Sequence, residues 1–104
     1  MNESWKLKEI TATGVAFPHP IDFGGAFLAV AGTSTTITAY NHAASATGSP
    51  VVPTTAALTV GQFVPPAGGL ALNVVPPANG IRCDAGLYVT VGGTGSPKIY
   101  ILWR

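Results

Sequence analysis

The chain has 104 residues, only 9% of them charged, and a formal net charge of +1 at pH 7. This length suits one domain around one core, and a single cysteine cannot form an internal disulfide. The few Lys and Arg residues form no basic cluster, which argues against nucleic acid as a partner. The longest apolar run, Ala26–Ala31, is too short for a membrane-spanning helix, which needs about 20 residues.

Charge is distributed unevenly along the chain. No Asp, Glu, Lys or Arg occurs between Asp22 and Arg82, whereas about a quarter of the residues in soluble domains are charged. Either much of this surface does not face solvent, or its hydroxyl and backbone groups bind the surrounding water. Both options indicate a protein that packs against other subunits.

The first predicted strand covers Trp5–Phe17, with a bulge at Gly14. The chain begins with charges of both signs and no apolar stretch, so we expect no secretory signal and synthesis in a cytoplasm. We also expect residues 1–9, anchored by Trp5, to form an N-terminal arm that reaches a neighbouring subunit.

Two strands and the longest loop come next. Pro18–Gly25 has the composition of a turn, Ala26–Ala31 is a short apolar strand, and Thr35–His42 is a β-branched strand rich in threonine. Ala43–Pro53 is predicted to be the loop.

Three further strands are predicted before the last part of the chain. Thr54–Phe63 is β-branched and is expected to bend at Gly61. Leu70–Val74 alternates apolar and other residues between two proline pairs, which cannot donate to a ladder. Ile81–Cys83 completes this group as a short strand.

The C-terminal residues Gly86–Arg104 predict a hairpin. Two segments with period-two alternation, Leu87–Val91 and Lys98–Trp103, flank the Gly- and Pro-rich turn Gly92–Pro97. No segment of the chain has a helical apolar stripe free of Gly and Pro.

These elements predict an all-β protein, with residues 1–104 forming a single antiparallel β-sandwich of seven or eight short strands. The spacing of the turns fits a jelly-roll or an immunoglobulin-like arrangement. If the first and last strands pair, Trp5 and Trp103 are expected to cap one core or one interface.

A Gly-rich segment invites comparison with a phosphate-binding loop. The residues Gly92–Lys98 lack the Gly-Lys-Ser/Thr order that opens a helix, and Pro97 precedes the lysine. We interpret this segment as a turn and expect no bound cofactor.

Two histidines and two aspartates are the candidate metal ligands of the chain. His19, His42, Asp22 and Asp84 do not have the short spacing typical of a metal site, so we expect no metal. A ring of His42 copies around a symmetry axis remains open.

Cys83 lies between Arg82 and Asp84, but the sequence offers neither a base nor a helix N-terminus to activate its thiol. We expect a small buried side chain. Arg82 and Asp84, two residues apart on an extended segment, are expected to point to the same side, where they pair or contact a neighbour.

Carboxylates are too few for acid–base catalysis. Glu3 and Glu9 lie near the N-terminus, and Asp22 and Asp84 flank glycine turns. We therefore expect no catalytic residue and no enzymatic activity.

The segments Gly80–Thr94 and Ile99–Arg104 resemble a recurrent ending of small virion proteins of tailed bacteriophages. In those proteins a Gly-Leu-Tyr-Val strand and a Gly-Gly turn precede an aromatic strand that stops at a terminal arginine, as here. The resemblance covers about the last quarter of the chain. It implies a small β-sandwich displayed on or built into a phage particle in symmetric copies.

This resemblance and the scarcity of charge lead to one functional expectation. The chain is expected to be a non-enzymatic head decoration or cement protein that bridges capsomers. Its expected partners are the major capsid protein or another virion protein and further copies of itself as a homotrimer, with no nucleic acid and no membrane. Its expected location is the virion.

Two alternatives stay open. One is a neck, tail or fibre-attachment component of the virion. The other is a carbohydrate-binding module, a function that jelly rolls often carry and that needs exposed aromatic residues on one face. In the sequence, Tyr40, Phe63 and Tyr100 are too scattered to indicate such a platform.

Overall fold

The structure is a computed structural model and describes residues 5–48, 50–64 and 81–104. Within these ranges the chain forms strands and no helix. The described residues therefore contain no helix that could cross a membrane. The described strands are β1 (Lys6–Ile10), β2 (Gly14–Phe17), β3 (Ile21–Val30), β4 (Thr33–Tyr40), β5 (Pro50–Val52), β6 (Phe63–Val64), β7 (Ile81–Cys83), β8 (Leu87–Thr94) and β9 (Lys98–Trp103).

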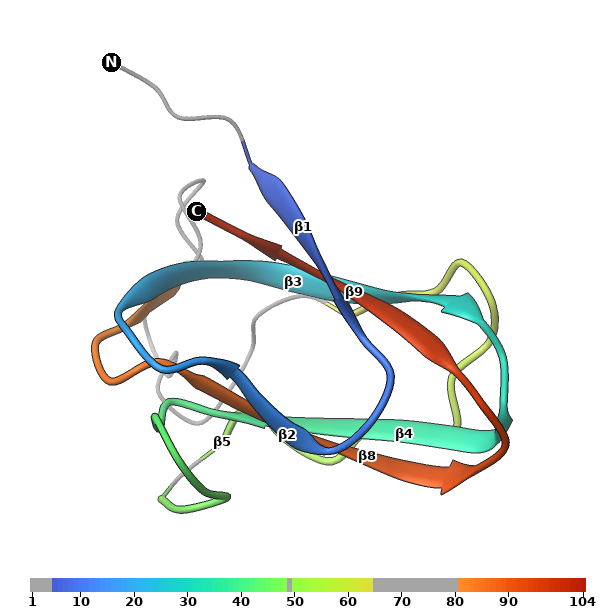
Figure 1. The fold of residues 1–104 in the computed structure, drawn as a ribbon. Coiled ribbons are helices and arrows are strands. Elements are labelled where there is room, and N and C mark those ends of the chain that lie inside the picture. Colours follow the sequence, from blue (N-terminus) through green and yellow to red (C-terminus); the bar gives the residue numbers. More distant parts are fainter. Residues whose placement is uncertain (1–4, 49, 65–80) are drawn as a thin grey trace.

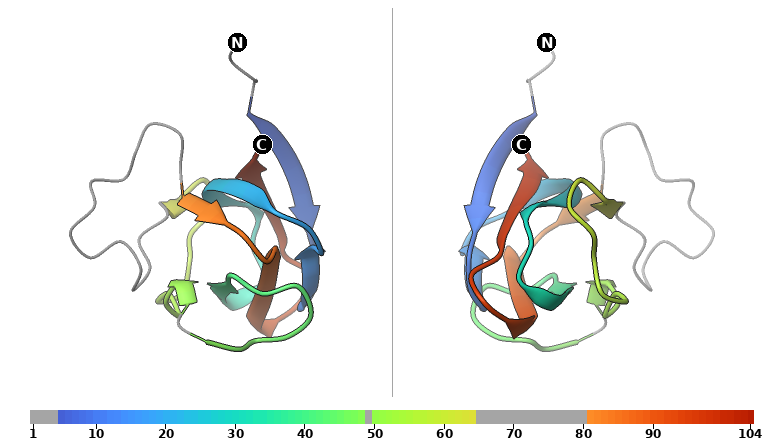
Figure 2. Two further views of the ribbon diagram at one scale, coloured as in Figure 1. Left: turned by 90° about the vertical axis from the view of Figure 1, so that its left-hand side faces the viewer. Right: turned by 90° about the vertical axis from the view of Figure 1, so that its right-hand side faces the viewer.

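The strands form two antiparallel sheets that pack face to face (Figure 1). Sheet A has the order β1-β9-β3-β6, with β7 also paired to β3, and sheet B has the order β2-β8-β4-β5. Figure 2 shows β1 and β2 on one side of the molecule and β5 and β6 on the other. The predicted all-β antiparallel sandwich is confirmed.

The strand pairing follows the jelly-roll order. Strand β1 pairs with β9, β2 with β8, β3 with β6, and β4 with β5, as in one long hairpin rolled up on itself. An immunoglobulin-like sandwich would instead pair several consecutive strands within one sheet, and among the described strands only β4 and β5 do so. Strand β7 is an addition beside the start of β3.

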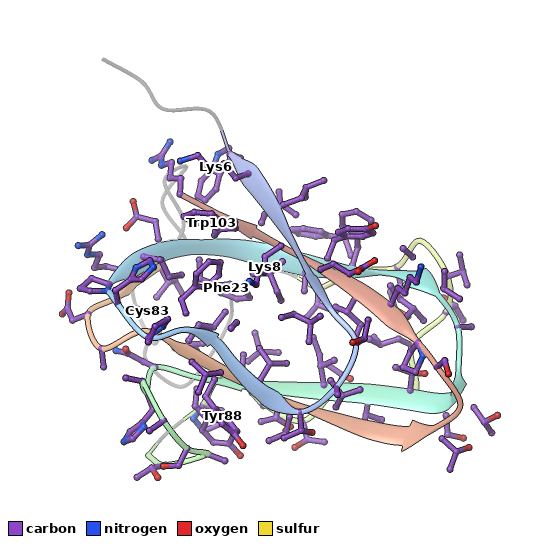
Figure 3. All side chains as sticks on the ribbon, viewed as in Figure 1. Lys6, Lys8, Phe23, Cys83, Tyr88 and Trp103 are labelled. Carbon is purple, nitrogen blue, oxygen red and sulfur yellow. The ribbon has the colours of Figure 1, made fainter. Side chains whose placement is uncertain are left out.

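The core lies between the sheets and uses alternate residues of each long strand, because side chains of successive residues point to opposite faces. Figure 3 shows Phe23 between the two layers. The largest side chains with almost no exposed area are Ile21, Phe23 and Leu28 of β3, Ile37 of β4, Val51 and Val52 of β5, Leu87 and Val89 of β8, and Ile99 and Ile101 of β9.

The predicted hairpin over Gly86–Arg104 is wrong. Strand β8 belongs to sheet B and β9 to sheet A, so residues 95–97 between them connect the two layers (Figure 1). The first half of the predicted turn Gly92–Pro97 belongs to β8. Period-two alternation shows that each strand has one buried face. That pattern fits two strands that face each other across a core as well as two strands that pair.

The predicted first strand, Trp5–Phe17, is two strands in different sheets. Gly14 begins β2 and the irregular pairing falls between Val15 and Phe17, so a bulge at Gly14 is wrong.

Residues 6–9 lie in β1 and belong to the sandwich rather than to an arm. Residues 1–4 lie outside the described residues. Pairing of the first and last strands is confirmed by the β1–β9 register.

The strand predicted over Thr54–Phe63 is also wrong apart from its last residue, which begins β6. The backbone N–H groups of Thr55 and Leu58 donate to carbonyls of β4 at 3.0 and 2.8 Å, so this segment follows β4 without a regular ladder. The bend at Gly61 is present, with φ of +84°.

The remaining predicted elements differ from the structure mainly at their ends. Strand β3 begins at Ile21, inside the predicted turn Pro18–Gly25, and the predicted loop Ala43–Pro53 contains β5. The predicted strands near β4 and β7 are confirmed. The predicted strand Leu70–Val74 lies outside the described residues.

Replacing Phe23 by alanine should lower the free energy of unfolding by about 3–5 kcal/mol, because it empties the volume of a fully buried ring. The matched variant Phe63→Ala removes a ring that is 50% exposed and should cost less than about 2 kcal/mol. Urea denaturation of both variants measures the difference. Equal losses would contradict the placement of the core.

Candidate functional site

Each of the two histidines has local contacts. The ring of His19 contacts the ring of Phe17, with centroids 5.8 Å apart. Nδ1 of His42 accepts hydrogen bonds from the backbone N–H groups of Ala44 and Ser45, each at 3.0 Å, and so holds the loop after β4. The suggested ring of His42 copies remains untested.

The aspartates form ion pairs with arginines at the β7 side of sheet A. Arg82 lies 3.3 Å from Asp22 and 3.5 Å from Asp84, so the expected pairing of Arg82 with Asp84 is confirmed. Asp22 also lies 3.7 Å from Arg104. Exposed ion pairs of this kind contribute about 0–1 kcal/mol each. Among the described residues, no three His, Cys, Asp or Glu side chains gather as metal ligands.

Cys83 is a buried thiol next to this ion-pair group, as the sequence indicates. Its side chain has no exposed area. Burial raises the pKa of the thiol from 9.0 to about 11, and the negative charges of Asp84 and Asp22 add to the rise, while Arg82 opposes it. A thiol that keeps its proton at neutral pH is a poor nucleophile.

The outer side of sheet A carries apolar and aromatic side chains where a sandwich usually exposes polar ones. The outward direction follows from alternation: Tyr100 lies between the buried residues Ile99 and Ile101, and Phe27 lies between buried Ala26 and Leu28. We call this surface the outer apolar face. Its members are Trp5, Leu7, Phe27, Phe63, Tyr100 and Leu102.

These side chains form one continuous surface across four strands. Leu7 is paired with Leu102, Tyr100 with Phe27, and Phe27 with Phe63. The rings of Phe27 and Tyr100 have centroids 5.6 Å apart. Leu7 and Phe63 are 58% and 50% exposed, and the other members are half-buried.

A glycine in β3 completes this surface. Gly25 has φ of +124° at an irregularity in the β3–β9 pairing, and a Cβ atom there would collide with the ring of Phe63. Phe63 therefore lies over Gly25, which pairs with Leu102. The absence of a side chain at Gly25 lets Phe63 lie close to the sheet.

The outer side of sheet B has a different chemistry. Tyr40 pairs with Tyr88, and Thr38 pairs with Thr90 in the next row of the same face. The Thr38 hydroxyl lies 2.7 Å from that of Thr54. Figure 3 shows Tyr88 on the side of sheet B that is turned away from Phe23. The Thr38 side chain is buried, so the hydroxyl groups that reach the surface of this face are those of the half-buried Tyr40, Tyr88 and Thr90. The exposed Val15 pairs with Tyr88 on the same face.

The two tryptophans lie on opposite faces of sheet A, so they do not cap one core or one interface. Trp103 points inward and contacts Phe17, with ring centroids 4.5 Å apart. Trp5 lies over Gly24 on the outer face, and the Arg104 guanidinium is 4.4 Å from its ring centroid.

Sequence reasoning missed the outer apolar face because its members are far apart in the chain. Phe63 and Tyr100 are scattered in the sequence but lie on either side of Phe27 on one face, whereas Tyr40 is on the opposite sheet. The signal was the pair of apolar residues, Phe27 and Leu102, at the outward positions of strands whose inward positions are also apolar.

Comparison of the chain with protein-family models, with curated proteins and with solved structures finds no match.

The raised pKa of Cys83 predicts a loss of stability in alkali. The folded state holds the thiol proton more tightly than the unfolded state, so the stabilisation is complete below about pH 9 and is lost as pH rises through about 11. Up to about 3 kcal/mol of the free energy of unfolding depends on this proton. Denaturation of the protein and of a Cys83→Ala variant from pH 7 to 11 measures it; parallel pH profiles would contradict the prediction.

Proposed function

We propose that this chain is a non-enzymatic structural protein of a bacteriophage virion, a head decoration or cement protein that docks on the capsid through the outer apolar face. The main support for this proposal is the outer apolar face, a continuous group of apolar and aromatic side chains on the outside of a sandwich. Large exposed apolar patches on soluble domains mark sites of interaction.

The composition of the outer apolar face suits a protein partner. Trp, Tyr and Phe are enriched in the buried centres of protein interfaces, where charged residues are depleted. Charges flank the face: Glu9 and Lys98 form an ion pair at 3.9 Å next to Tyr100, and Arg104 contacts Trp5. An apolar centre with a charged border is the usual arrangement of an interface.

The hydroxyl-bearing side of sheet B supports a one-sided attachment. A decoration protein must present one face to the shell and another to solvent. Sheet B, with the hydroxyl groups of the half-buried Tyr40, Tyr88 and Thr90, would face solvent without charged residues. Many copies on a symmetric shell add avidity to each weak contact. The resemblance of the C-terminal segments to small phage virion proteins points in the same direction.

The expected partners are the major capsid protein or another virion protein, and further copies of this chain in a trimer. A neck, tail or fibre-attachment role would use the same face with fewer copies. Copy number per particle separates these possibilities: hundreds of copies support the decoration role, whereas about a dozen support a site of limited symmetry.

Replacing two exposed members of the face, Leu7→Ser with Phe63→Ser, should weaken binding to undecorated capsids at least about tenfold, because it removes apolar area from the interface with little effect on the core. The matched control changes two equally exposed residues elsewhere, Val15→Ser with Val60→Ser, and should bind as the parent does. Co-sedimentation with capsids measures both. No capsid binding by the parent protein would contradict the proposed function.

The aromatic row on sheet A also favours a second candidate, a carbohydrate-binding module. Phe63, Phe27 and Tyr100 lie side by side across three strands, as a platform for sugar rings requires. A glycan screen tests this candidate. Binding that is lost in Tyr100→Ala and kept in Tyr40→Ala, on the opposite sheet, would support it over capsid docking.

A further inference from the structure

Among the described residues, some lysines form ion pairs and others do not. The side-chain carboxylates among the described residues are those of Glu9, Asp22 and Asp84, and each pairs with an arginine or with Lys98. Lys6 and Lys8 form no ion pair with any described carboxylate. They lie two residues apart on β1, so both side chains point to the same side of the strand.

Each of the two lysines lies over one of two aromatic rings that contact each other. The Lys6 ammonium is 4.9 Å from the Trp103 ring centroid (Figure 3), and the Lys8 ammonium is 5.7 Å from that of Phe17. The two rings contact each other, with centroids 4.5 Å apart. Each ammonium group therefore lies against an aromatic ring and has no ion-pair partner among the described carboxylates.

Strand β1 is also an edge. It ends the strand order of sheet A, and its residues 6–9 are exposed. An edge strand presents unpaired backbone groups to which an extended segment can add. A second copy of β1 in this position would bring lysines against lysines, and this repulsion disfavours pairing of two copies through this edge.

We propose that the edge of β1 that pairs with no described strand binds an extended acidic segment of a partner protein, with alternate carboxylates contacting Lys6 and Lys8. On an extended segment, residues i and i+2 point to the same side and are about 7 Å apart, which matches the spacing of the two lysines. Trp103 and Phe17 exclude water from one side of each charge pair. This inference rests on the proposed function only in taking the partner to be a neighbouring virion protein.

Other anionic partners fit these residues less well. A nucleic acid is bound by many cations along its phosphates, whereas this edge offers two. A small anion would meet both ammonium groups but would leave the backbone groups of the β1 edge unused. An acidic strand uses both features, so it is the occupant that the charge and the edge together favour.

A capped peptide of alternating glutamate and valine tests the proposal, with the matched glutamine–valine peptide as control. Titration by isothermal calorimetry should show binding of the glutamate peptide that weakens with added salt. The Lys6→Gln/Lys8→Gln variant should bind about tenfold more weakly. The control Lys98→Gln changes a lysine of the same sheet that already pairs with Glu9, and should bind as the parent does. The Trp103 indole N–H signal should shift only with the glutamate peptide.

Equal affinity for the glutamate and glutamine peptides would overturn the proposal, and so would equal binding by the parent and the double-glutamine variant. Tighter binding of free citrate or of single-stranded DNA than of the peptide would also overturn it. A charge-reversed variant, Lys6→Glu/Lys8→Glu, provides a separate check, since it should prefer a lysine–valine peptide.

The peptide titration contains no capsid, so its outcome is independent of the test of the outer apolar face. Peptide binding that depends on Lys6 and Lys8, together with no capsid binding, would support the edge site and contradict the decoration role. Capsid binding without peptide binding would support the decoration role and contradict the edge site.

Discussion

One apolar layer between two sheets determines most of this structure. Strands β3, β4, β8 and β9 each contribute alternate residues to it, and Phe23, Leu87 and Ile101 within it have no exposed area. A domain of this size with no disulfide depends on this layer for its stability. Because alternate residues are committed to the core, the outward residues of the same strands are free to carry function.

The outward residues give the two sheets different surfaces. Sequence composition left two readings of the scarce charge: a surface hidden from solvent, or one hydrated by hydroxyl groups. The outer apolar face of sheet A fits the first reading, and Thr90 with the two tyrosines of sheet B fits the second. The edge at β1 adds a third surface, where Lys6 and Lys8 hold the charges that no described carboxylate matches. The proposed decoration role requires such differences between the sides of the protein.

The fold class was predictable from sequence because period-two alternation indicates strands with one buried face. The burial of Cys83 was predictable because the sequence offers no group that would activate its thiol. The sheet to which each strand belongs was not predictable from sequence. Gly86–Arg104 reads as a hairpin, yet β8 and β9 lie in different sheets, since local alternation does not distinguish pairing from packing across a core. The outer apolar face was missed for the same reason, because the registers that bring Phe63, Phe27 and Tyr100 together are long-range.

Electron cryo-microscopy of capsids incubated with the purified protein tests the central claim most directly. The proposed function predicts density for the sandwich over the shell in hundreds of copies, with Phe27 and Phe63 buried against a capsid subunit and Tyr88 facing solvent. Bound copies with the outer apolar face open to solvent, or shells without added density, would contradict it.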